Sequence, residues 1–191
     1  EQMLRDVVAA TPGFKVAILR YFNVAGADPL GRTGQRTQNA THLIKVASEV
    51  ATGKRPSMQI FGTDYETADG TCVRDYIHVS DLAKAHVLVL SWLLKGGLLK
   101  GGLLNHGPIG LFNCGYGKGY SVREVLAAMG RVAGKAVEAE DAPPRPGDPP
   151  ALISDATALR QQLGWVPQYD DLDQIIKTAF DWERHLAQEK P

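Results

Sequence analysis

A helical pattern that leads directly into an unbroken apolar run constrains the fold more than any other feature of this chain. Apolar side chains recur at helical spacing over residues 3–8, and Thr11-Pro12-Gly13 ends that pattern. Residues 16–19 are then all apolar, which is typical of a strand buried on both faces of a parallel sheet. A helix that enters such a strand is half of a βαβ unit, so the sequence predicts an α/β fold with a parallel sheet. Because the strand before the helix is not in the sequence, we expect a preceding segment that carries more of this sheet.

Helix and strand patterns alternate along the rest of the chain. Further helices are expected over residues 42–51, 82–94, 121–132, 156–163 and 172–186, and strands over residues 15–22, 58–62, 109–114 and 137–140, with a short one from Ile153. Ser80 and Asp81 stand before the second of these helices, where their side chains would cap its free amides. The glycine turn at residues 115–119 matches neither common phosphate-loop spacing, so it is interpreted as a tight turn.

The composition is that of a globular protein and gives no sign of a nucleic-acid or membrane partner. Apolar residues make up 44% of the chain, and 21 basic residues balance 21 acidic ones. No nucleic-acid partner is expected without a basic excess, and no apolar run approaches the roughly 20 residues that a membrane span needs. Cys72 and Cys114 lack metal-ligand spacing, so no metal site is expected and a reduced, cytoplasmic setting fits. A Leu/Lys/Gly near-repeat over residues 93–105 has the form of a slippage insertion without chemistry.

The densest polar run, residues 70–81, lies where a strand pattern leads into a helix. Such a loop is a usual place for binding residues, and the planar guanidinium of Arg74 suits a phosphate group. The residues alone leave a second interpretation open, in which Arg74 and Asp75 are surface charges and Asp81 starts the helix. Asn23 follows the first strand at its carboxyl end, which is where ligands bind in open α/β sheets.

Three separated segments are together more specific than any one of them. They are residues 19–27, residues 60–65 with 69–79, and residues 142–148. In this order and spacing they closely resemble the carboxyl-terminal half of the UDP-glucose 4-epimerase family, whose members are extended short-chain dehydrogenases/reductases. The resemblance covers essentially the whole chain apart from the Leu/Lys/Gly insertion.

The resemblance implies a particular division of the chain. The fold would comprise the last strands of a Rossmann-type parallel sheet plus a small mixed α/β substrate-binding domain. Residues 1–28 and 76–120 would complete the sheet, and residues 29–75 and 121–191 would mainly form the nucleotide-sugar-binding domain. The cofactor-binding amino-terminal half would be absent, and with it the glycine-rich dinucleotide turn and the catalytic Tyr-x-x-x-Lys pair. No catalytic residue is therefore expected in the chain, which would be inactive alone.

The resemblance also implies an activity for the full-length protein. It would be an NAD-dependent isomerase of galactose and nucleotide-sugar metabolism that interconverts UDP-glucose and UDP-galactose, and a cytoplasmic homodimer. In the family, NAD takes the hydride from sugar C4, the 4-keto sugar turns over, and the hydride returns to the other face. Two alternatives stay open: a catalytically inert sugar-nucleotide-binding fragment, and a sister nucleotide-sugar dehydratase or decarboxylase.

Individual roles are implied only by the resemblance. Tyr21 and Phe22 would lie at the nicotinamide of NAD. Arg74 and Arg145 would bind the diphosphate and Asp148 the uridine ribose, which suits the chemistry of these side chains. The other expected substrate contacts, with the backbone of residues 59–61 pairing with uracil, are Asn23, His42, Leu43, Gln59, Ile60, Phe61, Tyr76 and Leu152. We expect positions 74, 145 and 148 to share one cavity with Asn23.

Four positions bear on how this chain differs from the family pattern. His42 and Lys45 stand where many members have Asn and Pro, and Pro144 replaces an Arg beside Arg145. Leu152 occupies the position that, in the family, tunes whether an N-acetyl group fits beside the sugar.

Overall fold

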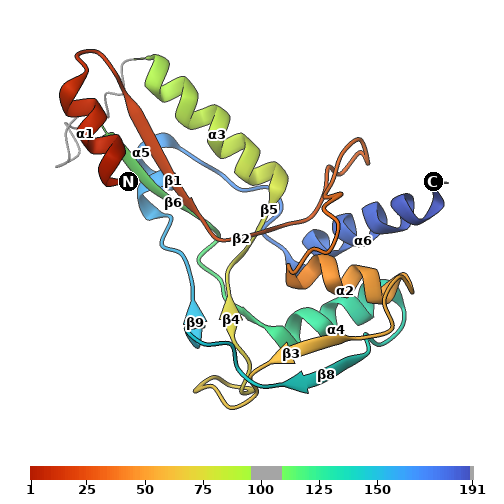
Figure 1. Ribbon diagram of the computed structural model, residues 1–191. Coiled ribbons are helices and arrows are strands. Elements are labelled where there is room, and N and C mark those ends of the chain that lie inside the picture. Colours follow the sequence, from red (N-terminus) through yellow and green to blue (C-terminus); the bar gives the residue numbers. More distant parts are fainter. Residues whose placement is uncertain (96–108, 190–191) are drawn as a thin grey trace.

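A computed structural model describes residues 1–95 and 109–189 of the chain (Figure 1). Within them the helices are α1 (Gln2–Ala10), α2 (Leu43–Ala51), α3 (Val79–Leu94), α4 (Val122–Ala133), α5 (Thr157–Leu163) and α6 (Leu172–Gln188). The strands are β1 (Val16–Tyr21), β2 (Asn23–Ala25), β3 (Met58–Phe61), β4 (Val73–Arg74), β5 (Tyr76–His78), β6 (Ile109–Cys114), β7 (Tyr120–Ser121), β8 (Ala139–Ala142) and β9 (Ala151–Leu152). The predicted α/β class is confirmed. Most of the near-repeat lies outside the described residues.

The predicted first strand pairs in parallel with β6, in register from Val16 opposite Ile109 to Tyr21 opposite Cys114. Helix α3 packs against β1, and α5 packs against β6. Val16 is buried, but the middle of β1 is only half-buried and its end is exposed. The expectation of a strand buried on both faces was therefore wrong for most of β1, and within the described residues β6 is its one strand partner.

A second parallel pair, β2 with β5, continues from this sheet toward the rest of the molecule. Asn23 lies opposite Tyr76 in its register, and the Asn23 amide donates to the Asp75 carbonyl at 3.0 Å. Helix α3 then begins at Val79, earlier than expected. Its N-cap is His78, whose Nδ1 accepts from the Ser80 amide at 3.1 Å, so the prediction that Ser80 and Asp81 cap this helix was wrong.

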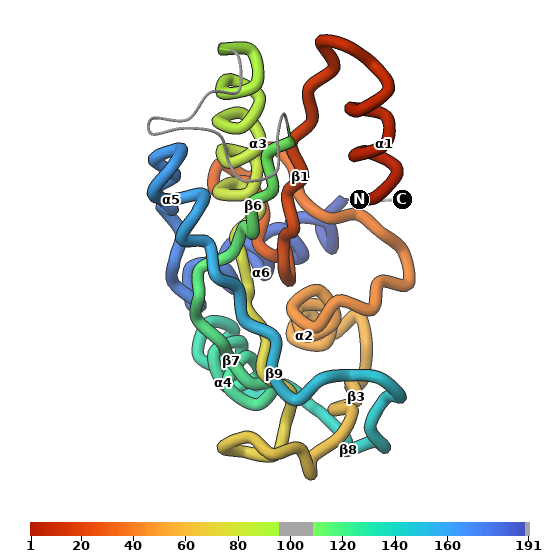
Figure 2. Tube along the Cα trace, turned by 90° about the vertical axis from the view of Figure 1, so that its left-hand side faces the viewer, coloured from red at the N-terminus to blue at the C-terminus, as the bar shows by residue number. Residues whose placement is uncertain are grey.

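The remaining elements form a second group around α2, α4 and α6, which pack on one another. In Figures 1 and 2 the parallel pair β3–β8 lies beside these helices, away from β1 and β6. Strand β4 bonds to β7 on one side and to β9 on the other. Since β7 directly precedes α4 and β9 lies in the segment before α5, this small sheet brings the two segments together. The edge strand expected at residues 137–140 overlaps β8, whereas β9 ends at Leu152, so the expectation of a strand that starts at Ile153 was wrong.

Local chemistry explains why α4 begins where it does. The Ser121 hydroxyl accepts from the Glu124 amide at 3.0 Å, and the Glu124 carboxylate accepts from the Ser121 amide at 2.7 Å. This reciprocal pair is a capping box, and Gly134, in the left-handed conformation, ends the helix. On its inner face Val125, Ala128 and Met129 are fully buried in the main core.

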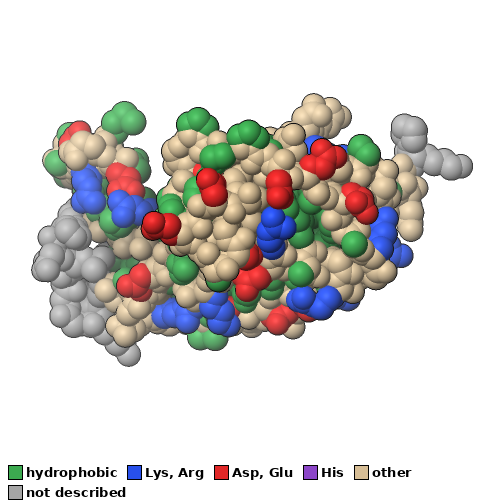
Figure 3. All heavy atoms as spheres, turned by 90° about the horizontal axis from the view of Figure 1, so that it is seen from below, with side chains coloured by type: hydrophobic (Ala, Val, Ile, Leu, Met, Phe, Trp, Pro, Cys, Tyr) green, Lys and Arg blue, Asp and Glu red, His purple; other side chains and the backbone are tan. Residues whose placement is uncertain are grey.

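The surface matches the balanced charge of the sequence. Acidic and basic side chains are interspersed on the face shown in Figure 3. Among the described helices, none combines the length and apolar character that crossing a bilayer requires.

Candidate functional site

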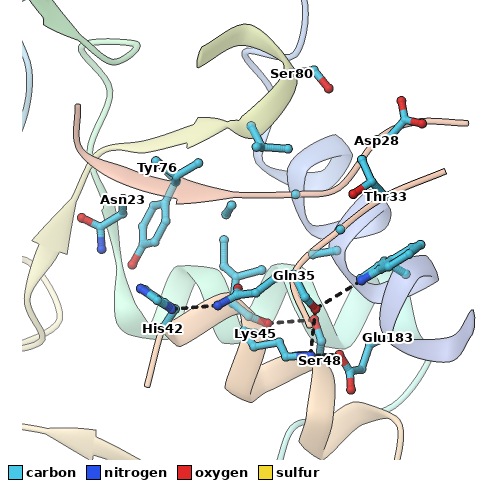
Figure 4. A pocket seen from close by; sticks show the side chains of 18 of the residues that line it. Asn23, Asp28, Thr33, Gln35, His42, Lys45, Ser48, Tyr76, Ser80 and Glu183 are labelled. Carbon is cyan, nitrogen blue, oxygen red and sulfur yellow. Dashed lines mark hydrogen bonds and ion pairs between the residues drawn. The ribbon is translucent and has the colours of Figure 1, made fainter. Parts of the chain in front are cut away.

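A cavity of about 950 Å³ opens where the two groups of elements meet. Its wall includes residues 21–26, which span the end of β1 and all of β2, and the first turns of α2 and α3. The loop that joins β2 to α2, residues 26–42 (the β2–α2 loop), covers one side, and α6 closes another (Figure 4). The carboxyl ends of two parallel strands therefore face one hollow, as expected for a ligand site in an α/β fold.

Six of the predicted contact residues line this cavity. They are Tyr21, Phe22, Asn23, His42, Leu43 and Tyr76. Figure 4 shows Asn23, Tyr76 and His42 at the same end of it. The Tyr76 residue is only 3% exposed, and this burial raises the pKa of its phenol, so the hydroxyl stays protonated near neutral pH. It can donate one hydrogen bond and accept others, while Asn23 offers a carboxamide beside it.

A second group of predicted residues gathers around β3, β4 and β9 instead. Arg74 donates from Nη1 to the Val73 carbonyl at 2.9 Å and to the Pro149 carbonyl at 2.8 Å. Its Nη2 lies 3.5 Å from Oδ1 of Asp148. The Arg145 guanidinium lies 3.8 Å from the centre of the Phe61 ring. The structure thus brings Arg74 to Asp148 and Arg145 to Phe61.

The rest of this group sits on the strands themselves. Gln59 is exposed and Ile60 is buried in β3, while Leu152 is exposed on β9 and lies in register with Arg74. None of the seven residues Gln59, Ile60, Phe61, Arg74, Arg145, Asp148 and Leu152 belongs to the wall of the 950 Å³ cavity. The single shared cavity expected for positions 74, 145 and 148 with Asn23 is therefore not seen. Residues 74–76 join the two groups directly along the chain.

Asp75 is a buried structural acceptor rather than a surface charge. Its carboxylate accepts from the amides of Tyr116 (3.1 Å), Gly117 (2.9 Å) and Ser154 (3.2 Å) and from the Ser154 hydroxyl (2.5 Å). A Cβ on Gly115 would lie 2.7 Å from the same carboxylate, so this turn needs glycine for close approach. The interpretation of residues 115–119 as a tight turn therefore fits, and the surface-charge interpretation was wrong for Asp75.

Asp81 has the same kind of role on α3. Its carboxylate is fully buried and accepts from the Tyr116 hydroxyl at 2.7 Å and from the amides of Gln168 (3.0 Å) and Tyr169 (2.8 Å). It therefore ties the turn after β6 and the segment before α6 to the start of α3. Within residues 1–95 and 109–189, no cluster of His, Cys, Asp and Glu has an arrangement that could hold a metal ion.

His78 lies behind the cavity wall and links β5 to α6. Its Nδ1 accepts from the Ser80 amide, so the ring proton is on Nε2, which donates to the Thr178 hydroxyl at 3.0 Å. A Cβ on Gly26 would lie 2.6 Å from the His78 ring, which explains the glycine at the end of β2. Burial lowers the pKa of His78 to about 4, so the ring is neutral at physiological pH.

Several residues in the cavity wall were not predicted as contacts from the sequence. Trp182 and Glu183 reach it from α6, Lys45 from α2 and Gln35 from the β2–α2 loop. The amphipathic pattern of residues 172–186 predicted that one face of α6 is buried, and it is. A pattern of this kind does not say which distant segment the buried face contacts, so these wall residues had no local signal.

Comparison with known proteins identifies the class to which this fold and site belong. The chain belongs to the NAD dependent epimerase/dehydratase family, whose sequence profile matches residues 1–98. It is 59% identical over 188 residues to the UDP-glucose 4-epimerase of Azospirillum brasilense. The matched region covers 98% of this chain and 51% of that protein. The chain thus spans about half the length of the curated relatives it matches.

Solved structures of such enzymes have the same fold. A UDP-glucose 4-epimerase from Bifidobacterium longum, in complex with NAD+ and UDP, superposes with a TM-score of 0.85 at 36% identity, covering 96% of this chain and 52% of that one. The enzyme from Brucella ovis in complex with NAD gives a TM-score of 0.83 at 42% identity, covering 94% of this chain and 52% of that one. The expected likeness to half of such an enzyme is confirmed.

Proposed function

We propose that this chain forms the UDP-sugar-binding part of an NAD-dependent UDP-glucose 4-epimerase, which interconverts UDP-glucose and UDP-galactose. The observation that carries the proposal is the position of Arg74. Its guanidinium contacts Asp148 and Pro149 in the loop at residues 145–149. Arg74 lies two residues before Tyr76, which belongs to the cavity wall. The 59% identity to the A. brasilense enzyme supports the same assignment.

The contact of Arg74 with Asp148 is the one that a diphosphate would replace. Its Nη1 is used by two backbone carbonyls, whereas Nη2 faces Asp148 at 3.5 Å, which is long for a charge-assisted hydrogen bond. Phosphate oxygens would replace this weak pair, and the Asp148 carboxylate would then accept from the ribose hydroxyls. Arg145, held on the Phe61 ring, would add the second cation on the same side.

The residues at the end of β1 fit the nicotinamide end of NAD. Phe22 is a half-buried aromatic ring in a largely apolar wall that also includes Val24 and Ala25. Tyr21 and Phe22 would contact the cofactor, and Asn23 with Tyr76 would orient the sugar beside it through hydrogen bonds. When bound, NAD supplies the acceptor and donor of the sugar C4 hydride. The 191 residues contain neither Tyr-x-x-x-Lys nor a glycine-rich dinucleotide turn, so a general base and the other cofactor contacts would come from outside them.

The finer assignments belong to the same proposal. Residues 1–28 and 76–120 would form the part that completes the cofactor-binding sheet, and residues 29–75 and 121–191 the nucleotide-sugar part. The complete enzyme would act as a homodimer in the cytoplasm. Light scattering on the complete enzyme tests the dimer, and a mass of one subunit at working concentration would reject it.

A chimera tests the function directly. The 191 residues replace the matching half of the A. brasilense enzyme, and the purified protein is incubated with NAD and UDP-galactose. We expect UDP-glucose as the sole sugar-nucleotide product, followed by NMR. A chimera that folds, binds UDP and forms no UDP-glucose would reject the epimerase assignment. A stable keto or deoxy sugar as product would indicate a different reaction of the same family.

A further inference from the structure

Helix α6 contacts several separate parts of the cavity wall through side chains on one face. Thr178, Trp182 and Glu183 lie at positions i, i+4 and i+5 of this helix. The Thr178 hydroxyl accepts from the Ala27 amide at 3.2 Å, at the start of the β2–α2 loop, and it also bonds to His78 at 3.0 Å. One helix therefore reaches β5, the β2–α2 loop and, through Glu183, α2.

Trp182 holds the middle of the β2–α2 loop. Its indole Nε1 donates to the Gln35 carbonyl at 3.2 Å, and a Cβ on Gly34 would lie 2.5 Å from the indole ring. Only glycine lets the loop backbone lie this flat on the ring. The Gln35 side chain in turn lies 3.1 Å from Nδ1 of His42, at the start of α2 (Figure 4).

Glu183 holds the first turn of α2 through a buried ion pair with Lys45. The two residues are 1% and 7% exposed, and their side chains are in direct contact. Lys45 Nζ is also 3.4 Å from the Gln35 carbonyl and 3.6 Å from Glu49, which itself bonds to Arg55. Ion pairs thus join five charged residues into one cluster between α2 and α6: Lys45, Glu49, Lys54, Arg55 and Glu183.

A buried charge cluster of this kind adds little net stability, but it fixes the relative position of the two helices that carry it. Removing charges from water costs about as much as their attraction returns, so a buried pair is often no better for stability than packed apolar residues. Its geometry is nevertheless specific, because each charge must keep its partner. Lys45 lies in the same turn as His42 and Leu43, two residues of the cavity wall and of the proposed substrate site.

We infer that Trp182 and Glu183 are positioning residues, which fix the β2–α2 loop and the first turn of α2 around the sugar-nucleotide cavity. This inference rests on the proposed function for the identity of the ligand. Neither side chain needs to touch the reacting atoms. They act through Gln35 and Lys45, and hence on the placement of His42 and Leu43.

Hydrogen exchange on the 191-residue chain tests the anchoring without any ligand. The variant is Glu183→Gln, which keeps the side-chain shape and removes its charge. We expect exchange of the α2 amides to speed up about tenfold more than exchange of the α4 amides, because the charge left without its closest partner lies on α2. The matched control is Asp173→Asn on the same helix, which removes an exposed pair with Arg131 of α4 (2.7 Å) and should leave α2 unchanged.

Trp182→Phe provides a milder second variant if Glu183→Gln does not fold. It keeps a ring against Gly34 but removes the hydrogen bond to Gln35. The same local increase in α2 exchange is expected. An equal increase in exchange in α2 and α4 would overturn the inference, because it would indicate only a loss of global stability.

Kinetics of the chimeric enzyme separates positioning from stability. In Glu183→Gln we expect KM for UDP-galactose to rise about tenfold with kcat within about twofold, as for a loss of uniform substrate binding. An unchanged KM well below the unfolding temperature would overturn the inference. If the wild-type chimera neither binds UDP nor converts UDP-galactose, the proposed function fails. A local increase of amide exchange in α2 of the Glu183→Gln variant would still support the anchoring by α6.

Discussion

The Asp75 carboxylate is fully buried and accepts hydrogen bonds from three amides and one hydroxyl. It lies between two residues that are assigned to ligand binding, Arg74 and Tyr76. Alternate residues of an extended segment point to opposite sides, so one short stretch can turn Arg74 and Tyr76 to one side and Asp75 to the other. At this scale, residue type alone could not predict which charge serves a ligand and which serves the fold.

Asp75→Ala should therefore destabilise the chain strongly. Three amides, two of them buried, and a hydroxyl would lose their acceptor, and we expect the free energy of unfolding to fall by about 3–5 kcal/mol. Urea unfolding followed by circular dichroism measures the change. Asp141→Ala, which removes only an exposed pair with Arg123, should change it by less than about 1 kcal/mol. Similar losses in the two variants would contradict the role of Asp75.

Arg74→Ala tests the residue that carries the proposed function. In the chimeric enzyme we expect UDP-sugar binding to weaken by about 2–4 kcal/mol, the cost of losing a charge-assisted pair. Calorimetry with UDP and the KM for UDP-galactose both report this change. Arg123→Ala removes a guanidinium from an exposed pair on α4 and serves as the control. An unchanged affinity in Arg74→Ala would remove Arg74 from the site.

His78 makes stability depend on pH in a defined window. Its pKa is lowered to about 4 by burial, compared with about 6.5 in an unfolded chain. The unfolded state binds more protons between these values, so the free energy of unfolding should decrease as the pH falls from about 6.5 to about 4. Above pH 6.5 this contribution is constant.

His78→Gln should flatten this part of the stability curve, measured by urea unfolding at a series of pH values. His185→Gln, on the exposed face of α6, provides the control and should retain the slope. An equal slope in wild type and His78→Gln would show that other groups cause the pH dependence.

Helix α4 begins where the side chains of Ser121 and Glu124 satisfy the free amides of its first turn. The sequence predicted a helix over residues 121–132, which matches this start to within one residue. The prediction of the helix start failed for α3. The capping group there is an imidazole nitrogen of His78, and histidine is not among the residue types preferred at helix N-caps. Strand ends were also less predictable than helices, because β4, β7 and β9 are two-residue pairings that depend on distant partners.

Ser121→Ala should shorten or loosen the first turn of α4. The hydroxyl accepts from the Glu124 amide and also contacts Asp69, so we expect a loss of about 1–2 kcal/mol in the free energy of unfolding. Chemical unfolding measures the loss. Ser121→Asp keeps an acceptor at the cap but places a second carboxylate beside Asp69, so it should recover little stability. Full recovery would show that the bond to Asp69 contributes nothing.

At the scale of the whole molecule, the sequence predicted the α/β class, the parallel pairing of strands and most helices. By resemblance it also named candidate ligand-binding residues, and their roles stay a prediction. It did not predict that these residues divide between a cavity and a neighbouring loop cluster, because that division depends on how two groups of elements meet. For the same reason it did not predict the contributions of Trp182 and Glu183, which reach the cavity from a helix more than 130 residues after Lys45.

The pairing of β1 has a practical consequence for handling the chain. Within the described residues one edge of this strand keeps its hydrogen-bonding groups unshared, and Met3, Val7 and Tyr21 nearby are 79%, 45% and 56% exposed. An open, apolar edge is a template on which strands of other molecules can add. We expect the 191 residues alone to precipitate at high protein concentration, so a low protein concentration or a solubilising fusion suits their purification.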